Sequence, residues 1–204
     1  MIALRPFGRS ILLAGALSLT VWWTVGAQEA SVQKLIERGA LDEAVQRVEA
    51  ERDNPESTYL AAQAFLKMKN NDRAGETFAH LREAGGEDWK AIGESGATMV
   101  GGDQDAAMAA AERAIAANGD NPYGHYQAGM VANRQNNFQR AAEAFGRSVE
   151  LKPDLAYGHY YAGMACQRIK EIAKMSEHLT MFLKLAPDAP ERATVAAMLR
   201  TLRG

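Results

Sequence analysis

Small, aromatic and aliphatic residues recur along this chain at a regular interval. The stretch YGHYQAGM at Tyr123–Met130 returns as YGHYYAGM at Tyr157–Met164, with one letter changed. Apolar residues in these stretches, and in the segments that follow them, are three or four positions apart. Residues with that spacing lie on one face of a helix. The pattern therefore predicts a succession of amphipathic helix pairs, one pair per period.

The period that begins at Pro122 shows the pattern of one helix pair in full. Ala128–Gly129 place two small residues in the first helix, which allows the second helix to approach closely. The segment AAEAF then places the small Ala141 and the large Phe145 on one face of the second helix. Pro153 ends the pair, because proline cannot continue a helix.

The other periods keep this spacing with substitutions. Ala74 and Phe78 form the small and large pair of the first period, within DRAGETF. The second helix of the next period, DAAMAAAERAIAAN, consists mainly of small residues, so close helix packing is expected there. In the last period, Met175 and Leu179 stand where Ala and Phe are expected.

This pattern resembles the tetratricopeptide repeat family, whose period of about 34 residues equals the interval from Tyr123 to Tyr157. The resemblance covers roughly residues 31–203 and is most specific between Pro122 and Pro187. It implies an all-α fold, a right-handed superhelical solenoid of helix–turn–helix repeats with a C-terminal capping helix. The expected boundaries are a half-repeat at 31–53, repeats at 54–87, 88–121, 122–155 and 156–188, and a capping helix at 189–204.

The segment 1–27 has the pattern of a secretory signal peptide. Arg5 and Arg9 precede an uncharged run, ILLAGALSLTVWWTVG, and small residues follow at a cleavage site after Ala27. The alternative is an uncleaved membrane anchor, for which the run is a little short. In either case the sequence predicts an exported chain, periplasmic or otherwise extracytoplasmic, and a membrane contact only if the segment is retained.

Composition excludes several classes of partner and chemistry. The formal net charge is −2 and there is no basic patch, so neither nucleic acid nor anionic lipid is an expected partner. A single cysteine, Cys166, excludes an internal disulfide. His125 and His159 are repeat-equivalent, but their expected separation is too large for one metal ion. No motif for a cofactor, metal or catalytic site is present, so the chain is not expected to be an enzyme.

The resemblance also implies where a partner would bind. First helices of such solenoids line a concave groove, at positions that carry the same residue types in two copies here. Carried over by position, the expected partner-binding groove residues are Trp89, Tyr123, Tyr126, Met130, Asn133, Arg134, Tyr157, Tyr160, Met164, Gln167 and Arg168. Tyr and Met suit protein recognition, and the arginines suit a carboxylate.

An alternative for the same residues is packing between adjacent first helices. The Lys and Asn clamp that some family members use for a peptide C-terminus is not present at these positions. The expected ligand is therefore an apolar or aromatic-rich protein segment.

The function expected from the sequence is an exported adaptor that binds such a segment, in bacterial envelope assembly, secretion or maturation. The alternatives are an anchored assembly subunit that uses its convex face or ends for oligomerisation, and an enzyme or small-ligand binder, which no sequence feature supports. The sequence does not predict the oligomeric state.

Overall fold

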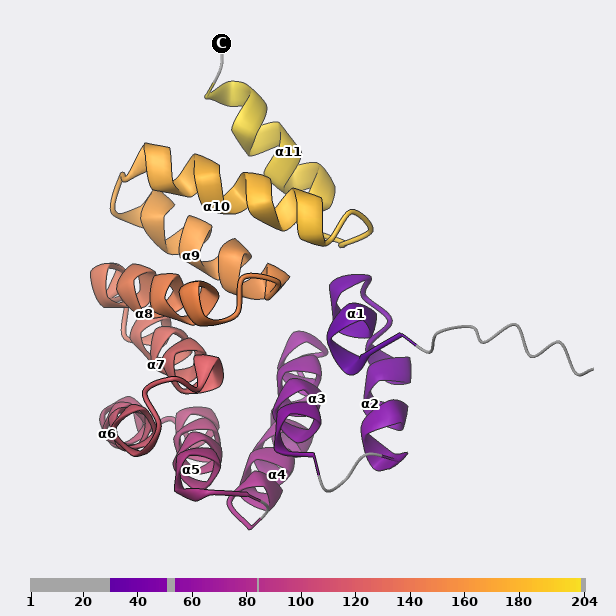
Figure 1. Ribbon diagram of the computed structural model, residues 1–204, viewed down its shortest axis with the longest axis vertical. Helices are drawn as coiled ribbons and strands as arrows, with labels where there is room; N and C mark the ends of the chain where they lie inside the picture. Colours follow the sequence, from indigo (N-terminus) through magenta and orange to yellow (C-terminus); the bar gives the residue numbers. More distant parts are fainter. Residues whose placement is uncertain (1–29, 51–53, 84, 203–204) are drawn as a thin grey trace, which may run out of the picture.

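The computed structural model describes residues 30–50, 54–83 and 85–202, and the expected signal segment lies outside them. The described residues form eleven helices that pack in sequence order, with turns between them (Figure 1). Among them, no helix is both long enough and apolar enough to cross a membrane. The predicted all-helical solenoid is confirmed.

The helices are arranged as successive antiparallel pairs with one helix at the end. They are α1 (Val32–Glu37), α2 (Leu41–Ala50), α3 (Pro55–Lys67), α4 (Asn71–Leu81), α5 (Glu87–Gly101), α6 (Gln104–Ala117), α7 (Pro122–Arg134), α8 (Phe138–Leu151), α9 (Ala156–Arg168), α10 (Ile172–Leu185) and α11 (Arg192–Thr201). The odd-numbered helices α3 to α9 are the first helices of their repeats, and the even-numbered ones are the second helices.

Local sequence signals fix where the helices begin. Asn54 and Asn121 cap α3 and α7, each accepting hydrogen bonds from backbone N–H groups of the first turn. A proline follows each of them at the first helical position, where its missing N–H costs nothing. Asn137 caps α8 in the same way by accepting from the Arg140 N–H. The repeated Asn-Pro pairs therefore mark the starts of first helices.

The turn inside each pair has one residue in the left-handed region. Lys69, Asn136 and Lys170 have φ of 59°, 59° and 64°, and Gly102 has φ of 99° at the equivalent place. Their spacing follows the sequence period, so the turn conformation recurs with the same period as the helices. Gly102, and Gly39 with φ of 79° in the turn between α1 and α2, are free of the steric cost that a side chain brings to this conformation.

Two glycines explain the small residues of the repeated stretches. A Cβ atom on Gly129 would lie 2.8 Å from Phe145, and one on Gly163 would lie 2.7 Å from Leu179. Both large residues belong to the second helix of the same pair and are fully buried. The predicted close approach of the two helices is therefore present, and it leaves no room for a methyl group at either glycine.

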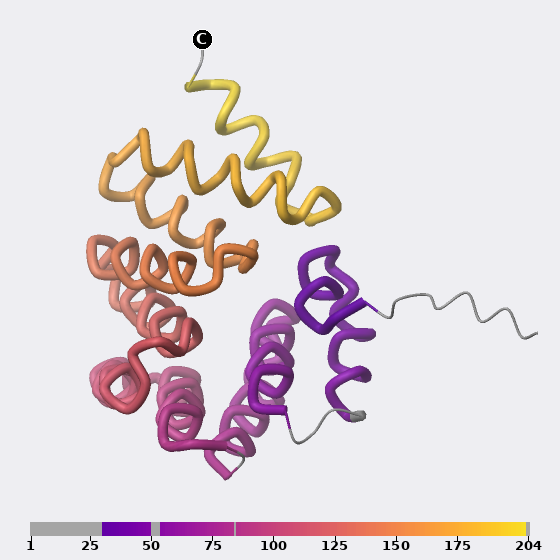
Figure 2. Tube along the Cα trace, in the orientation of Figure 1, coloured from indigo at the N-terminus to yellow at the C-terminus, as the bar shows by residue number. Residues whose placement is uncertain are grey.

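The superhelix curls until its two ends approach each other. Figures 1 and 2 show α1 close to the start of α9 and the end of α10. Contacts confirm the approach: the Gln33 amide donates to the Asp154 carbonyl oxygen at 2.8 Å. A Cβ atom on Gly39 would lie 2.8 Å from the Pro190 side chain. The first helices therefore surround a hollow, and the approach of the N-terminal and C-terminal helices makes it narrow.

Candidate protein-binding surface in the hollow

The predicted groove residues divide into a buried set and an accessible set. Those near the start of each first helix are buried or half-buried in the hollow: Trp89, Tyr123, Tyr126 and Tyr157. Tyr160, which is equivalent to Tyr126, is half-buried, and the residues of the later turns are half-buried or exposed: Met130, Asn133, Arg134, Met164, Gln167 and Arg168. The stripe is therefore continuous along the helices but accessible along only part of its length.

The buried set forms an aromatic cluster with Tyr59 of α3. The Tyr59 ring lies 5.2 Å from Tyr123, 6.1 Å from Tyr126 and 6.3 Å from Trp89, measured between ring centroids. Tyr126 also contacts Tyr161 edge to face at 6.0 Å. Because aromatic pairs prefer such tilted and edge-to-face arrangements, the cluster is a stable apolar core. Burial raises the pKa of both Tyr59 and Tyr126 well above the ordinary value.

A chain of hydrogen bonds satisfies the polar atoms of this core. The Tyr59 hydroxyl donates to Gln127 Oε1 at 3.1 Å, and Gln127 Nε2 donates to Ser95 Oγ at 3.2 Å. The Ser95 hydroxyl in turn donates to the Ala107 carbonyl oxygen at 2.7 Å. Since all three side chains are buried, the chain of bonds fixes α3, α5 and α7 relative to one another.

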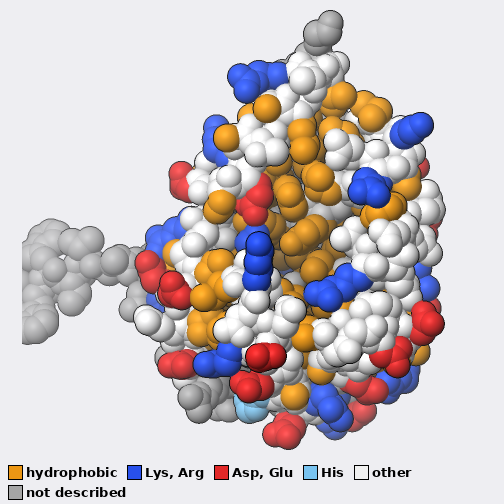
Figure 3. Space-filling view, turned by 180° about the vertical axis from the view of Figure 1, so that it is seen from behind, with side chains coloured by type: hydrophobic (Ala, Val, Ile, Leu, Met, Phe, Trp, Pro, Cys, Tyr) orange, Lys and Arg blue, Asp and Glu red, His pale blue; other side chains and the backbone are white. Residues whose placement is uncertain are grey.

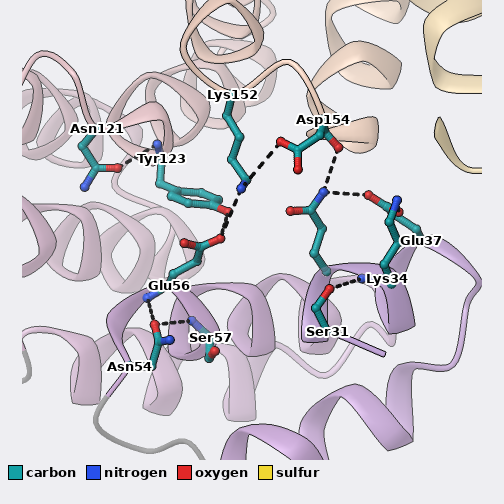
Figure 4. A network of polar contacts seen from close by, with 11 residues as sticks. Ser31, Lys34, Glu37, Asn54, Glu56, Ser57, Asn121, Tyr123, Lys152 and Asp154 are labelled. Carbon is teal, nitrogen blue, oxygen red and sulfur yellow. Dashed lines mark hydrogen bonds and ion pairs between the residues drawn. The ribbon is translucent and has the colours of Figure 1, made fainter. Parts of the chain in front are cut away.

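One opening of the hollow is closed by a polar network, shown in Figure 4. The Tyr123 hydroxyl donates to Glu56 at 2.6 Å, and Lys152 lies 3.5 Å from the same carboxylate and 3.6 Å from Asp154. Gln33 continues the network by donating to Asp154. Burial, and then the Glu56 carboxylate, raise the pKa of Tyr123. The network joins α1, α3, α7 and the turn before α9.

A second set of contacts, the Lys67–Glu191 clasp, closes the hollow farther along. Lys67 Nζ lies 2.8 Å from Glu191 Oε1 and 3.9 Å from the centroid of the Tyr157 ring. The Tyr157 hydroxyl donates to Glu191 Oε2 at 2.7 Å. Burial alone would raise the pKa of Glu191, but the hydrogen bonds from Lys67 and Tyr157 outweigh it and hold that pKa below its ordinary value.

Little space remains between these closures. A cavity of about 30 Å³ lies among α1, α3, α7 and α9, with Tyr59, Tyr126 and Tyr161 in its wall. That volume holds about two water molecules. The buried Gln63 Nε2 atom has no hydrogen-bond partner and belongs to the same wall. A protein segment therefore has no room in this half of the hollow.

The other half of the hollow is open. In Figure 3, hydrophobic side chains gather in a depression at the centre of the molecule, with Lys and Arg side chains on both sides. Met130 follows Tyr126 by one helical turn, and Arg134 follows Met130 by another, so exposure rises along one helix face. Tyr160, Met164 and Arg168 repeat this series on α9.

The two arginines of this surface have no acidic partner among the described residues. Arg134 Nη1 donates only to the Met99 carbonyl oxygen, at 3.4 Å. The Arg168 guanidinium lies 4.2 Å from the centroid of the Phe138 ring. Both side chains therefore keep most of their hydrogen-bonding capacity for another molecule.

The histidines and the cysteine have structural surroundings. His125 Nε2 lies 2.9 Å from the Gly119 carbonyl oxygen, and His159 Nε2 lies 3.1 Å from that of Pro153. Each ring thus anchors a first helix to the turn that precedes it. Cys166 is buried, and burial raises the pKa of its thiol. The described residues include no cluster of three His, Cys, Asp or Glu side chains suited to a metal ion.

Sequence reasoning did not find the closure in which Glu56 and Lys67 take part. The partners that make the closure, Asp154 and Glu191, lie in turns between helices and far away in the sequence. No periodic signal marks them, because their role depends on how tightly the whole superhelix curls.

Comparison with known proteins agrees with this architecture. Residues 123–155 match the family model described as "Tetratricopeptide repeat". This segment is a tetratricopeptide repeat. It corresponds to α7, α8 and the turn after them. The Tyr126–Arg134 series on α7 lies within it.

Several solved structures are similar in fold. YrrB, described as a TPR protein with an unusual peptide-binding site, is 18% identical with a TM-score of 0.49, over 83% of this chain and 88% of that one. MamA from Desulfovibrio magneticus RS-1 is 20% identical with a TM-score of 0.47, over 76% and 90%. The APC/C hetero-tetramer Cut9–Hcn1 gives a TM-score of 0.56 at 15% identity, over 82% of this chain and 33% of that chain. No curated protein sequence matches significantly.

Proposed function

We propose that this chain is a scaffold that binds a segment of a partner protein on the open half of its hollow. The observation that carries the proposal is the repeated series of an aromatic residue, a methionine and an unpaired arginine on α7 and α9. Methionine adapts its shape to apolar partners, and arginine binds carboxylates with two parallel hydrogen bonds. Such a surface favours a partner that is apolar on one side and carries acidic groups.

The geometry also suggests how those acidic groups are spaced. Arg134 and Arg168 are equivalent positions of neighbouring repeats, and packed neighbouring helices lie about 10 Å apart. Two carboxylates about 10 Å apart correspond to residues i and i+3 of an extended segment or i and i+7 of a helix. The apolar residues between them would then contact Met130 and Met164.

The experiment is a cross-linked capture of partners with the protein and with Arg134→Glu/Arg168→Glu. Arg82→Glu/Arg200→Glu is the matched control, because both residues are exposed and the net charge changes equally. A partner held by wild type and control but lost from the test variant supports the proposal. The captured segment, synthesised as a peptide, should then bind with an affinity that falls as salt rises. Equal capture by all three proteins would place binding elsewhere on the molecule.

We further propose that the protein works outside the cytoplasm, in assembly, secretion or maturation at the cell envelope. The support is the charge and hydrophobicity pattern of residues 1–27. Mass spectrometry of the N-terminus tests this proposal. A mature chain that begins at Gln28 supports export with cleavage, an exported intact chain indicates the anchored alternative, and an intact cytoplasmic chain would refute both.

A further inference from the structure

The outer side of the superhelix carries a groove that is separate from the hollow. It has a volume of about 580 Å³ and lies between α8 and α10, the second helices of the third and fourth repeats. Its floor includes small and apolar residues, among them Ala142, Gly146 and Met181, and most of the other lining residues are charged or polar. Since α8 and α10 are on the opposite side of their repeats from the Tyr126–Arg134 series, this groove is not part of the surface proposed above.

One glycine accounts for the groove. In the preceding pair of second helices, Glu112 of α6 forms an ion pair with Arg140 of α8, which bridges the two helices. The equivalent positions one repeat farther along hold Gly146 and Lys174. A Cβ atom on Gly146 would have no other heavy atom within 4 Å. The side chain that fills the equivalent space one repeat earlier is therefore absent here.

Loss of that bridge also changes the charge of the groove. Lys174 pairs instead with Glu171 of its own helix, at 2.8 Å. Across α8 and α10, whose residues are all described, no ion pair connects the two helices. Glu143 and Glu177 both line the groove, and neither has a cation within ion-pair distance. The Glu143 carboxylate accepts only from the Gln139 amide, at 2.8 Å.

The other charged residues of the groove do not cancel the negative charge of Glu143 and Glu177. Arg147 lies 3.0 Å from Glu150 of its own helix, so each cation of the groove is already paired. The His159 and His178 rings at one end of the groove contact each other, with 3.2 Å between their Nδ1 atoms. His159 Nε2 faces the Pro153 carbonyl oxygen, which fits a neutral pair in which His178 Nδ1–H donates to His159 Nδ1.

We propose that the α8–α10 groove binds a segment of a second protein that presents lysine side chains. The methylene chain of a lysine suits the small and apolar lining, and its ammonium suits Glu143 and Glu177. The scaffold would then connect two partners of opposite charge, an acidic segment in the hollow and a basic one on the outer side. The two sites share no residue, so either proposal can fail without the other.

The test uses two acetylated peptide amides, AKAAKA and AEAAEA, titrated into the protein while NMR follows the ring protons of His159 and His178. The lysine peptide should shift these signals saturably, and the glutamate peptide should not. Replacement of both Glu143 and Glu177 by Gln should weaken binding of the lysine peptide at least about tenfold. Absence of a saturable shift with the lysine peptide would overturn the proposal.

Position 146 supplies the matched variants. Gly146→Glu should restore the bridge to Lys174, fill the groove and abolish the shift caused by the lysine peptide. Gly146→Ala adds one methyl group in open space and should leave binding within about twofold of wild type. Melting curves verify that both variants are folded, which is expected because each replaces a glycine inside a helix. An unchanged shift in Gly146→Glu would also overturn the proposal.

Discussion

The two halves of the hollow are built from the same helix faces, yet one is closed and the other is open. Tyr126 and Met130 are one helical turn apart on α7, and the first is buried while the second is half-buried. The difference in burial comes from the residues that face each side chain across the hollow. Tyr126 faces Tyr59 of α3, whereas Arg134, farther along the same face, has only the Met99 carbonyl oxygen as a hydrogen-bond partner among the described residues.

This contrast shows that position within a repeat does not determine accessibility. A concave stripe is a binding surface only where the rest of the superhelix leaves it uncovered. In this chain α1 and α3 cover the start of the stripe, and the Lys67–Glu191 clasp marks the limit of the covered part. The equivalence of repeats predicts the residue types of a surface, and the curvature of the whole solenoid selects which of them are available.

The sharpest test of the contrast compares truncations on its two sides. Tyr126→Ala should lower the free energy of unfolding by about 3–5 kcal/mol, because it leaves a cavity in the aromatic cluster. Met130→Ala should cost about 1 kcal/mol or less, since its side chain is half-buried at the surface. Chemical denaturation of both variants measures the difference. Similar losses of unfolding free energy in the two variants would mean that the hollow is not divided into a closed half and an open half.

A second test compares the filled interface between α7 and α8 with the open outer side of the same helix pair. Gly129→Val should lower stability by about 1–3 kcal/mol, because its Cβ meets Phe145 at 2.8 Å. Gly146→Ala, on the other helix of the same pair, should raise stability by about 0.5–1 kcal/mol. Thermal melts of the two variants should therefore move in opposite directions. A destabilised Gly146→Ala would show that the α8–α10 groove is not open.

The sequence predicted the parts of the fold that repeat. The period, the small residue at Gly129, and the spacing of Ala141 and Phe145 follow from local rules that apply in every copy. Local rules are sufficient there because each repeat contacts mainly its neighbours. The same logic makes the turn at Asn136 recognisable from its place in the period.

Closure of the hollow could not be predicted in this way. It depends on a small rotation between successive repeats, which accumulates until α1 reaches the turns before α9 and α11. The contacts that result, such as Gln33 with Asp154, join residues more than a hundred positions apart and occur once. The aromatic identity of Tyr123 and Tyr157 was clear from the sequence, but their burial follows from this accumulated curvature.

The clasp supplies a smaller test of the same contrast. Glu191→Gln should lower stability by about 1–2 kcal/mol, because Lys67 loses a charged partner in a half-buried place. Hydrogen exchange should then rise in α1, which faces the same opening, while exchange in α7 stays unchanged. Glu43→Gln removes only an exposed ion pair with Arg38, so it is a control with the same substitution that keeps the clasp and should not produce this pattern. An equal rise in hydrogen exchange in all helices would mean that the clasp does not act as a separate closure.

Acidity provides the finest test, because the pKa of Glu191 is held below its ordinary value. A carboxyl group with a lowered pKa in the folded state contributes stability above its unfolded pKa, near 4.3, and loses that contribution as pH falls through the folded value. The difference in stability between wild type and Glu191→Gln should therefore be constant from about pH 7 to pH 5. It should shrink as pH falls below the unfolded pKa and through the lowered folded pKa, where the wild-type carboxyl becomes neutral like the glutamine. Urea denaturation at each pH measures both proteins under identical conditions, so the titration of other groups cancels. A difference that does not shrink at all as pH falls below the unfolded pKa would show that the clasp acts through shape, and that the boundary between the closed and open halves does not depend on charge.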